Sequence, residues 1–399
     1  MRPLARILHI RPSSFVGGPE RQLMHYAQLD ESASTETILG TFVGEREGRA
    51  FVAAVEERGG MSLSLPAGSL GDCAAFPGLL RYLREQKIAL VCTHGYQADL
   101  MGILAGRIRH LPVACFIRGW TWEDWKVRVY EAADRSFLPL ASRVVCLSEV
   151  QANQLGRRRR LRHKLRVVLN VVENRNVSPK QRLEARQEIR RRFGIAQESS
   201  VVAIAGRLSP EKGAEYLIQA VPHISKDFPD ARFVIFGDGR LRTQLEEIAK
   251  TIGAAGRIIF ARHVPEFTAL LPGVDVLANP SLTEVMPNVV LEAMAAGVPV
   301  VATSVGGVAE IAGESGALAL VPPADALSLA SAIAQLLADP VRAVALGIAG
   351  QKRVRQAFSP ERQSAQLLAL YQELIPSLRS EQLAPGLASE ADAFHRADV

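Results

Sequence analysis

The stretch VVAIAGRLSPEKG at residues 201–213 decides the fold class, because it contains a whole strand and the polar loop that follows it. A run of small and β-branched apolar residues comes first, followed by a glycine and a loop rich in polar residues. The next residues, AEYLIQAVPHI, space their apolar positions as an amphipathic helix does. A strand, a loop and a covering helix in this order form the repeating unit of a parallel sheet.

The same unit recurs in both directions along the chain. The predicted strands are residues 6–10, 37–43, 89–93, 113–117, 143–147 and 166–169 in the first half, and 200–205, 232–237, 258–260, 274–278, 300–303 and 317–321 in the second. We therefore predict an α/β protein with two doubly wound parallel-sheet, Rossmann-like domains facing a central cleft. Ligands of such sheets bind beyond the carboxyl ends of the strands, so the strand-to-helix loops are where functional residues are expected.

The domain boundary is predicted just before residues 179–194, a charged helical stretch that ends in a glycine. This divides the chain into a first domain at 1–178 and a second at 179–359. The last helix, predicted at 360–378, could pack back onto the first domain. The polar, alanine-rich residues 379–399 are predicted to be disordered.

Composition and charge limit the function. The chain has 399 residues, of which 48% are apolar and 22% charged, and this ordinary globular composition excludes fibrous and low-complexity classes. The net charge of +6 hides a formal charge of +12 on residues 1–196, with 31 Lys and Arg against 19 Asp and Glu, and of −6 on the remainder. A basic half favours an anionic partner, such as a phosphorylated substrate, an anionic membrane surface or nucleic acid.

The cysteines and the apolar runs indicate the compartment. Cys73, Cys92, Cys115 and Cys146 have no C-x-x-C spacing, which argues against a disulfide framework or a thiolate zinc site, and we predict reduced thiols. The N-terminus predicts a first strand in place of a signal peptide. No uninterrupted apolar run is long enough to span a bilayer. We expect a cytoplasmic protein.

Two strand-end loops carry candidate phosphate-binding groups. Arg207 and Lys212 follow the strand at 200–205 and could converge on one diphosphate, the guanidinium as a fork and the ammonium as a point charge. Gly17 and Gly18, which precede a helix, allow a close backbone approach to an anion, although a plain turn fits them equally well. The motif at 237–239 is a lone G-x-G and does not support a dinucleotide site.

The segment NPSLTEVMPNVVLEAMAAGVP at residues 279–299 is the most informative one. Pro287 suits a first helical position, which places Glu284 in the loop at the helix mouth and Glu292 inside the helix. The N–H groups at 286–289 and the helix dipole make an anion site between the two carboxylates. Since carboxylates accept hydrogen bonds from hydroxyls, this combination suits a ligand that has both phosphate and sugar hydroxyls.

At this point the chain resembles a family. Four ordered motifs carry the likeness, namely Gly17-Gly18-x-Glu20, the loop from Gly206-Arg207-Leu208 to Glu211-Lys212-Gly213, the Glu284/Glu292 pair, and PVVATSVGGVAEI at 299–311. Together they resemble the family 4 glycosyltransferases of the GT-B fold, over nearly all of residues 5–375. In place of the Gly-Phe-Gly run that many members have after the first glutamate, this chain has Val285-Met286-Pro287-Asn288.

The resemblance implies a retaining, metal-independent enzyme with no cofactor, which transfers a sugar from a nucleotide-diphosphate sugar. It implies that Arg207 and Lys212 bind and stabilise the leaving diphosphate, that Glu284 bonds to the donor sugar, and that Glu292 binds ribose hydroxyls. The family often has a sugar-contacting His at a strand end, and His94 is the candidate for it, although a structural histidine is the alternative. The donor-binding set predicted in full is Gly17, Gly18, Gly206, Gly237, Pro287, Asn288, Val289 and Glu292.

Two features of the first half are left open. Trp120 and Trp122 belong to a short run that holds every tryptophan of the chain, and they could bind the acceptor, lie at a membrane interface or staple a loop. Arg157, Arg158, Arg159 and Arg160 form a basic run that could be a solvated face, attract anionic lipid or bind an acceptor diphosphate. Nucleic acid is not expected, because no binding module is present.

The predicted function is transfer of a sugar to a carbohydrate or lipid-linked acceptor in surface polysaccharide or glycolipid synthesis, in the cytoplasm or on the inner face of the membrane. The alternatives are a nucleotide-sugar epimerase or hydrolase on the same scaffold, and a catalytically silent carbohydrate-binding protein. The sequence does not identify the base, the sugar, the acceptor, the linkage or the oligomeric state.

Overall fold

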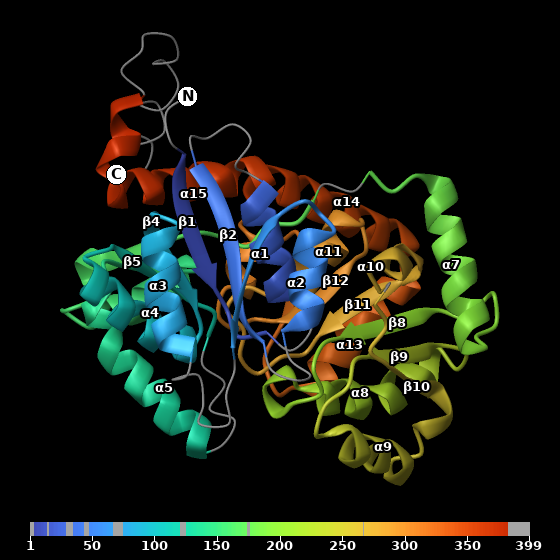
Figure 1. Ribbon diagram of the computed structural model, residues 1–399. Coiled ribbons are helices and arrows are strands. Elements are labelled where there is room, and N and C mark those ends of the chain that lie inside the picture. The colour runs from blue at the N-terminus through green and yellow to red at the C-terminus, as the bar shows by residue number, and fades with distance from the viewer. Residues whose placement is uncertain are drawn as a thin grey trace.

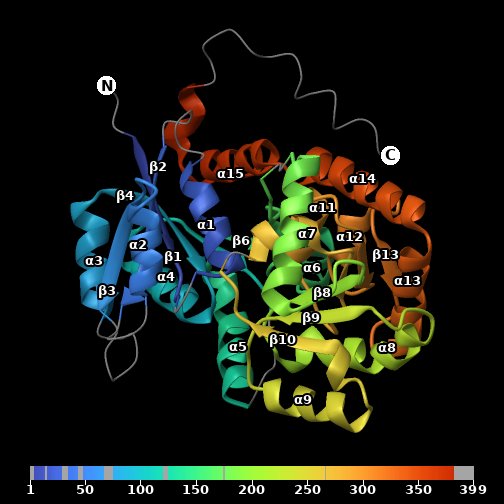
Figure 2. The same ribbon diagram turned by 90° about the vertical axis from the view of Figure 1, so that its right-hand side faces the viewer.

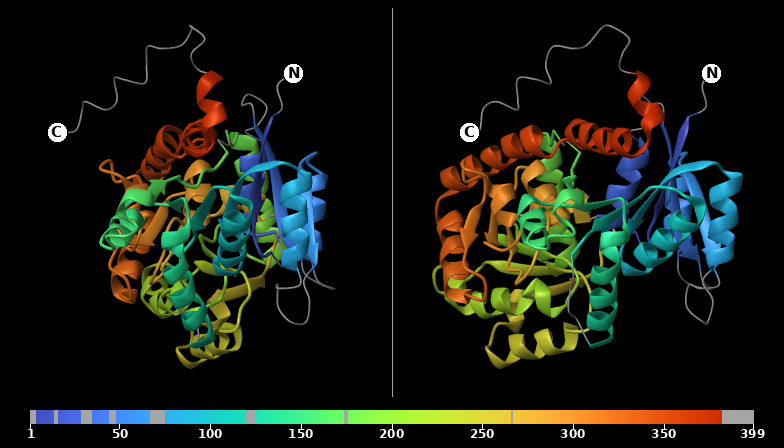
Figure 3. Two further views of the ribbon diagram at one scale, coloured as in Figure 1. Left: turned by 60° about the vertical axis from the view of Figure 1, so that its left-hand side comes forward. Right: turned by 90° about the vertical axis from the view of Figure 1, so that its left-hand side faces the viewer.

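The computed structural model describes residues 4–13, 16–28, 35–43, 48–66, 75–119, 125–173, 176–265 and 267–381. Within these residues the chain forms two parallel sheets that lie in separate halves of the molecule (Figures 1 and 3). In spatial order, the first sheet contains β3 (Met61–Pro66), β2 (Thr35–Val43), β1 (Ala5–Ile10), β4 (Ile88–His94), β5 (Val113–Ile117), β6 (Arg143–Cys146) and β7 (Leu165–Val167). The second contains β10 (Ile258–Arg262), β9 (Arg232–Phe236), β8 (Val201–Ala205), β11 (Val276–Asn279), β12 (Val300–Thr303) and β13 (Ala319–Val321).

Helices connect the strands and cover the sheets. Those of the first half are α1 (Gly18–Gln28), α2 (Arg49–Glu56), α3 (Phe76–Glu85), α4 (Tyr96–Arg109), α5 (Trp125–Phe137) and α6 (Glu149–Gly156). Those that follow are α7 (Pro179–Phe193), α8 (Ala214–Asp227), α9 (Arg242–Thr251), α10 (Phe267–Leu270), α11 (Asn288–Ala295), α12 (Val308–Ala312), α13 (Ala326–Ala338), α14 (Pro340–Ala357) and α15 (Pro360–Leu374). The predicted fold of two wound parallel sheets is confirmed.

The strands form where the sequence places unbroken apolar runs. β5 is buried at every position, as expected for a strand with helices on both faces of its sheet. Each predicted strand agrees with an observed one to within two residues at either end. The prediction omitted β3, whose sequence MSLSLP alternates serine and leucine because it is an edge strand with one exposed face.

The last long helix, α15, crosses back to the first sheet (Figures 1 and 2). Leu367, Leu370 and Tyr371 lie in the same apolar cluster as residues of β1 and β4. Glu373 accepts hydrogen bonds from Arg143 at 2.7 Å and from Arg166 at 2.8 Å, which anchors the helix on β6 and β7. α15 ends at Leu374, earlier than predicted, because Pro376 favours an extended residue before it and a short 3₁₀ turn follows.

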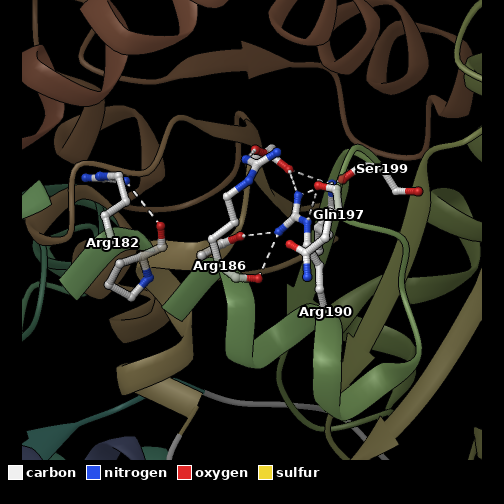
Figure 4. Close-up of polar contacts among 9 residues, drawn as sticks. Arg182, Arg186, Arg190, Gln197 and Ser199 are labelled. Carbon is white, nitrogen blue, oxygen red and sulfur yellow. Dashed lines mark hydrogen bonds and ion pairs between the residues drawn. The ribbon is translucent and has the colours of Figure 1, made fainter. Parts of the chain in front are cut away.

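Helix α7 connects the two halves and begins with a full capping box. Ser178 accepts from the backbone N–H of Gln181, whose side chain accepts in return from the Ser178 N–H, and Gly194 closes the helix at a φ of 64°. Its Arg190 side chain is completely buried and is held by the carbonyls of Gln197 and Ser199 and by Asp275 (Figure 4). This buried guanidinium joins α7 to the start of the second sheet.

Cys92, Cys115 and Cys146 are buried free thiols, as predicted, and Cys73 lies outside the described residues. No single helix in the described ranges has the length and apolar composition needed to cross a bilayer, and one bent pair, Ala326–Ala338 with Pro340–Leu374, meets that test only when taken together.

Candidate active site

A cavity of about 730 Å³ lies between the two halves of the chain. The first half lines it from the loops after β1 and β5 and from one side of α6, and the second half lines it from the loops after β8, β11 and β12. These are carboxyl ends of strands, where parallel sheets bind ligands. Its charged lining residues are Arg11, Glu20, Arg118, Arg135, Arg158, Arg207, Glu211, Lys212 and Glu284.

Three of the residues predicted to be catalytic meet in this cavity. Lys212 Nζ lies 2.6 Å from Glu284 Oε1, and Ser281 donates a hydrogen bond to the same oxygen at 2.9 Å. Arg207 pairs with Glu211 at 3.0 Å. The sequence separation of Lys212 and Glu284 is large, and the adjacent strands β8 and β11 bring them together. A cation, a carboxylate and a second cation are thus held on one wall.

Two predicted donor-binding glycines shape this wall without lining the cavity. A Cβ on Gly237 would lie 1.9 Å from the carbonyl oxygen of Gly206, so the loops after β8 and β9 contact each other through bare backbone. Gly213 has a φ of 60°, and a Cβ there would lie 2.2 Å from the oxygen of Pro280. The glycines therefore set how closely the loop with Arg207 and Lys212 approaches the loop with Glu284.

Glu292 is separated from Glu284 by the turn at the start of α11. Pro287 is the N-cap residue and α11 begins at Asn288, one residue later than predicted. Glu292 lines a smaller cavity of about 180 Å³ and lies 3.2 Å from Arg21 of α1. The structure thus places the two glutamates at two different hollows.

The predicted glycine loop of the first half meets the start of α11. Gly18 begins α1, and a Cβ on it would lie 2.5 Å from Nδ2 of Asn288. The N–H of Gly17 donates to Glu20 at 3.0 Å, and Glu20 in turn pairs with Arg11 at 2.7 Å. Gly17, Gly18, Pro287, Asn288 and the neighbouring Val289 are therefore brought together from distant parts of the sequence.

His94 does not face the cavity, and the prediction that it does is wrong. Its side chain is completely buried, because it is the last residue of β4 and its ring stacks between His9 and Phe116 on the neighbouring strands. Arg118, one residue beyond the end of β5, lines the cavity in its place. The sequence analysis did not single out Arg118, and its position directly after the strand in FIRG was the signal that could have found it.

A chain of hydrogen bonds leads from Arg118 into the core. Arg118 Nε donates to His94 Nδ1 at 3.3 Å, His94 Nε2 lies 2.9 Å from His9 Nδ1, and His9 Nε2 lies 3.0 Å from the hydroxyl of Tyr371. Because a guanidinium only donates, His94 must accept at Nδ1 and donate from Nε2. His9 then accepts at Nδ1 and donates to Tyr371. This chain links a cavity residue to α15.

Acid is expected to destabilise the protein through these histidines. Burial, and then Arg118, lowers the pKa of His9 to about 3, and the same causes lower the pKa of His94 well below its usual value. Below about pH 6.5 the unfolded chain binds protons that the folded chain excludes, so the free energy of unfolding falls as the pH falls, by up to about 1.4 kcal/mol per pH unit for each histidine. Urea unfolding between pH 6.5 and 5 measures this slope.

The control is the exposed His163. His163→Asn should leave the slope unchanged, and replacing both His9 and His94 by Asn should reduce it. An unchanged slope in that double variant would contradict the prediction.

Gly306 is expected to be essential for the position of Glu284. It has a φ of 52°, and a Cβ on it would lie 1.7 Å from the backbone oxygen of Glu284. Gly306→Ala should displace the Glu284 loop and, if Glu284 has the predicted catalytic role, lower activity at least about tenfold, since a small displacement of a catalytic group has effects of this size or larger. Steady-state kinetics measures the loss.

Gly316→Ala is the matched control, because Gly316 has a φ of 59° and a Cβ there meets no described atom within 4 Å. Gly316→Ala has the same conformational cost of a left-handed backbone, about 1–2 kcal/mol, but its new Cβ does not contact another described part of the chain. Equal activity of the two variants would show that the contact with Glu284 is not what matters.

An inter-domain contact that the sequence analysis missed lies beside the cavity. The carboxylate of Glu310, from α12, accepts hydrogen bonds from the backbone N–H groups of Glu149 at 2.9 Å and Val150 at 2.6 Å. These are orphan donors at the first turn of α6, and a carboxylate stabilises that end of a helix. The cap comes from the other half of the chain, so no local capping signal could have revealed it.

The four arginines of the predicted basic run lie in different surroundings. Arg158 lines the main cavity, and Arg157 lines a separate hollow of about 610 Å³ together with Arg162 and Arg166. Arg159 and Arg160 are exposed. Trp120 and Trp122 lie outside the described residues.

Comparison with known proteins identifies both halves. The family model described as "Glycosyl transferase 4-like domain" matches residues 17–171, and that described as "Glycosyl transferases group 1" matches residues 199–339. A 2-deoxystreptamine glucosyltransferase from Streptomyces kanamyceticus is 31% identical over 47% of this chain and 50% of its own length. A GDP-mannose-dependent alpha-(1-6)-phosphatidylinositol monomannoside mannosyltransferase from Mycolicibacterium smegmatis is 36% identical over 42% and 46%. The chain thus spans about half the length of these curated relatives.

Solved structures are similar over the whole described fold. HepE from Anabaena, solved in complex with UDP-glucose, has a TM-score of 0.80 at 22% identity and covers 92% of this chain and 100% of its own. WaaG, a glycosyltransferase involved in lipopolysaccharide biosynthesis, has a TM-score of 0.67 at 15% identity, with 95% and 100% covered. At these identities the likeness establishes the two-domain fold.

Proposed function

The chain belongs to the family 4 type of glycosyltransferases with the GT-B fold, and from this premise we propose that it transfers a sugar from a nucleotide-diphosphate sugar to a carbohydrate or lipid-linked acceptor. The observation that carries the proposal is the convergence of Arg207, Lys212 and Glu284 on one cavity between the sheets. Two cations suit a diphosphate, and a carboxylate suits sugar hydroxyls. We propose retention of configuration, without a metal or another cofactor.

The two domains would divide the substrates. We propose that residues 179–359 bind the donor and that residues 1–178 bind the acceptor. Arg207 and Lys212 would stabilise the diphosphate as it leaves, which is electrostatic stabilisation of developing charge. The backbone at Gly17 and Gly18, close to Asn288, would approach the donor from the opposite side, and Glu292 would bind ribose at the smaller hollow. Similarity to a GDP-mannose-dependent enzyme and to a UDP-Gal transferase acting on a diphosphoundecaprenol acceptor supports a nucleotide-sugar donor.

The test is the melting temperature with UDP, GDP and ADP at equal concentration. Ligands that bind only the folded state raise it by mass action, and we expect one of the three to do so more than the others. The matching nucleotide sugar should then give acceptor-dependent release of that nucleotide. Failure of all three to stabilise the protein would overturn the proposal, and sugar release or epimerisation without any acceptor would favour the epimerase or hydrolase alternative.

We propose in addition that the first domain docks peripherally on an anionic membrane surface. Leu100, Leu104 and Ile108 form an apolar stripe along α4 with exposed fractions of 39%, 41% and 56%. Burial lowers the pKa of the Lys164 ammonium group most, the charge of Arg143 lowers it next, and the charge of Arg107 also lowers it. Arg107 is in the last turn of α4, so basic groups lie near the end of this helix. An apolar stripe beside cations suits an anionic lipid interface.

Vesicle flotation tests this surface. Replacing both Leu104 and Ile108 by Glu should abolish flotation with vesicles that contain phosphatidylglycerol, because two carboxylates would meet anionic lipid. The control replaces Val344 and Ile348 by Glu on α14, where the side chains are each 61% exposed on the other half of the chain. Flotation that is equal for the two double variants would rule out α4 as the docking face.

A further inference from the structure

The two walls of the main cavity differ in charge. On the second-domain wall Arg207 and Lys212 face Glu211 and Glu284, each cation lies within 3.0 Å of a carboxylate, and the formal charges cancel. The first-domain wall holds the four arginines 11, 118, 135 and 158 against Glu20, a formal charge of +3. The excess positive charge therefore lies on the wall opposite the loops that hold Arg207 and Lys212.

Two of these arginines come from neighbouring helix ends. Arg135 is in the last turn of α5, and Arg158 follows the end of α6. Burial, and then the charge of Arg158, lowers the pKa of Arg135, while the buried Glu131 and Asp134 act in the opposite direction. Both guanidinium groups line the same cavity, and the carboxylates of Glu131 and Asp134 offset part of the repulsion between them. An anion in this part of the cavity would meet two guanidinium groups at once.

Gln151 and Gln154 of α6 also line the cavity, together with Arg158. Gln151 is committed to the backbone, since its amide accepts from the Leu147 N–H at 2.9 Å and donates to the Ile117 carbonyl at 3.1 Å. Gln154 of α6 is exposed, lines the same cavity and offers a polar group to a ligand there. A ligand held at Arg135 and Arg158 would reach towards Glu284 along this side of the cavity.

We propose that the acceptor carries a phosphate or diphosphate group, which Arg135 and Arg158 bind at the first-domain end of the cavity. This inference rests on the proposed function, because it takes the second-domain wall to be the donor site. Guanidinium groups match phosphate oxygens with paired hydrogen bonds, and a wall with a charge of +3 suits a multiply charged phosphate better than a single carboxylate. The acceptor is either a soluble sugar phosphate or a lipid-linked diphosphate.

Calorimetric titration with inorganic pyrophosphate tests the site. The full chain is first saturated with the nucleoside diphosphate that raises its melting temperature, so that the donor site is filled. Pyrophosphate should still bind the wild type, and replacing Arg135 and Arg158 by Gln should weaken this binding at least about tenfold, the effect expected for losing charge-assisted hydrogen bonds. Arg158→Gln alone should weaken it several-fold, and its exposed position keeps this variant folded.

The matched control replaces Arg81 and Arg84 by Gln, two exposed arginines of α3 in the same domain, and removes the same charge. Equal pyrophosphate affinity in this variant and in the Arg135/Arg158 variant, or no binding to the saturated wild type, overturns the inference. Competition by glucose 1-phosphate assigns the site to a soluble acceptor, and competition by farnesyl diphosphate in detergent micelles assigns it to a lipid-linked one. If neither compound competes with pyrophosphate, the inference is overturned.

The two proposals fail differently. If no nucleotide stabilises the protein, the proposed function fails. Titration of the nucleotide-free chain, compared with Arg158→Gln, still shows whether the arginine wall binds phosphate. If a nucleotide binds and the arginine variants behave as wild type, only the phosphorylated acceptor is excluded.

Discussion

Arg207→Ala is expected to lower kcat by about 10²- to 10³-fold with little change in stability. Arg207 lines the cavity beside Lys212 and Glu284, where the leaving diphosphate of the proposed donor would develop its charge. Removing one pre-positioned group of this kind from a transition state has an effect of that size. The side chain is 53% exposed, and its pair with Glu211 contributes at most about 1 kcal/mol to folding.

The measurement compares kcat with the melting temperature of the unliganded protein. Arg240→Ala is a control on the same domain, because Arg240 is an exposed arginine outside the cavity lining. It should retain wild-type kcat. If Arg207→Ala keeps kcat within threefold of wild type, the leaving-group role is excluded.

Arg190→Ala is expected to lower the free energy of unfolding by about 3–5 kcal/mol, because it leaves buried backbone carbonyls without their charged donor and each such loss costs about 1–3 kcal/mol. The Arg190 guanidinium donates to the carbonyls of Gln197 at 3.0 Å and Ser199 at 2.6 Å, and it lies 3.2 Å from Asp275 (Figure 4). Alanine would leave the two carbonyls without this donor next to the first strand of the second sheet, whereas Asp275 would keep its contacts with Arg186 and with the Val201 N–H. Urea denaturation measures the loss.

Arg191→Ala is the matched control, because it removes the same side chain from the next position of the same helix. Arg191 is 73% exposed and pairs with Glu188 at 2.8 Å, so its loss should change stability by less than about 1 kcal/mol. Similar losses in the two variants would mean that the buried contacts of Arg190 do not explain the effect, and helix propensity would not explain it either, because alanine is the better helix former.

The outcome of the sequence predictions depended on whether the signal was local. The strands of both sheets were predicted from apolar runs, and α7 from its terminal glycine and charge pattern, because these signals lie within the element. The edge strand β3 has a weaker, alternating signal and was missed. The loop with Arg207 and Lys212 was predicted to hold functional residues because it follows a strand. In a parallel sheet, ligands bind beyond the carboxyl ends of the strands.

The predictions that failed concerned where side chains point. His94 and Arg118 both lie at strand ends in the first sheet, and their sequence contexts do not tell them apart. His94 is still inside β4 and packs between neighbouring strands, whereas Arg118 is one residue beyond β5 and reaches the cavity. The cap that Glu310 supplies to α6 could not be read locally either, since its donors lie about 160 residues away.

The sequence by itself determined the two wound sheets, the family, and the loops that hold Arg207, Lys212 and Glu284, because periodicity and motif spacing depend on neighbouring residues. Only the tertiary structure decided that Glu284 and Glu292 lie at separate hollows, that α15 packs on the first sheet, and that Arg118, Arg135 and Arg158 share one wall. These arrangements depend on which strand ends and helices meet across the fold, and contacts between residues that are far apart in sequence leave no local pattern.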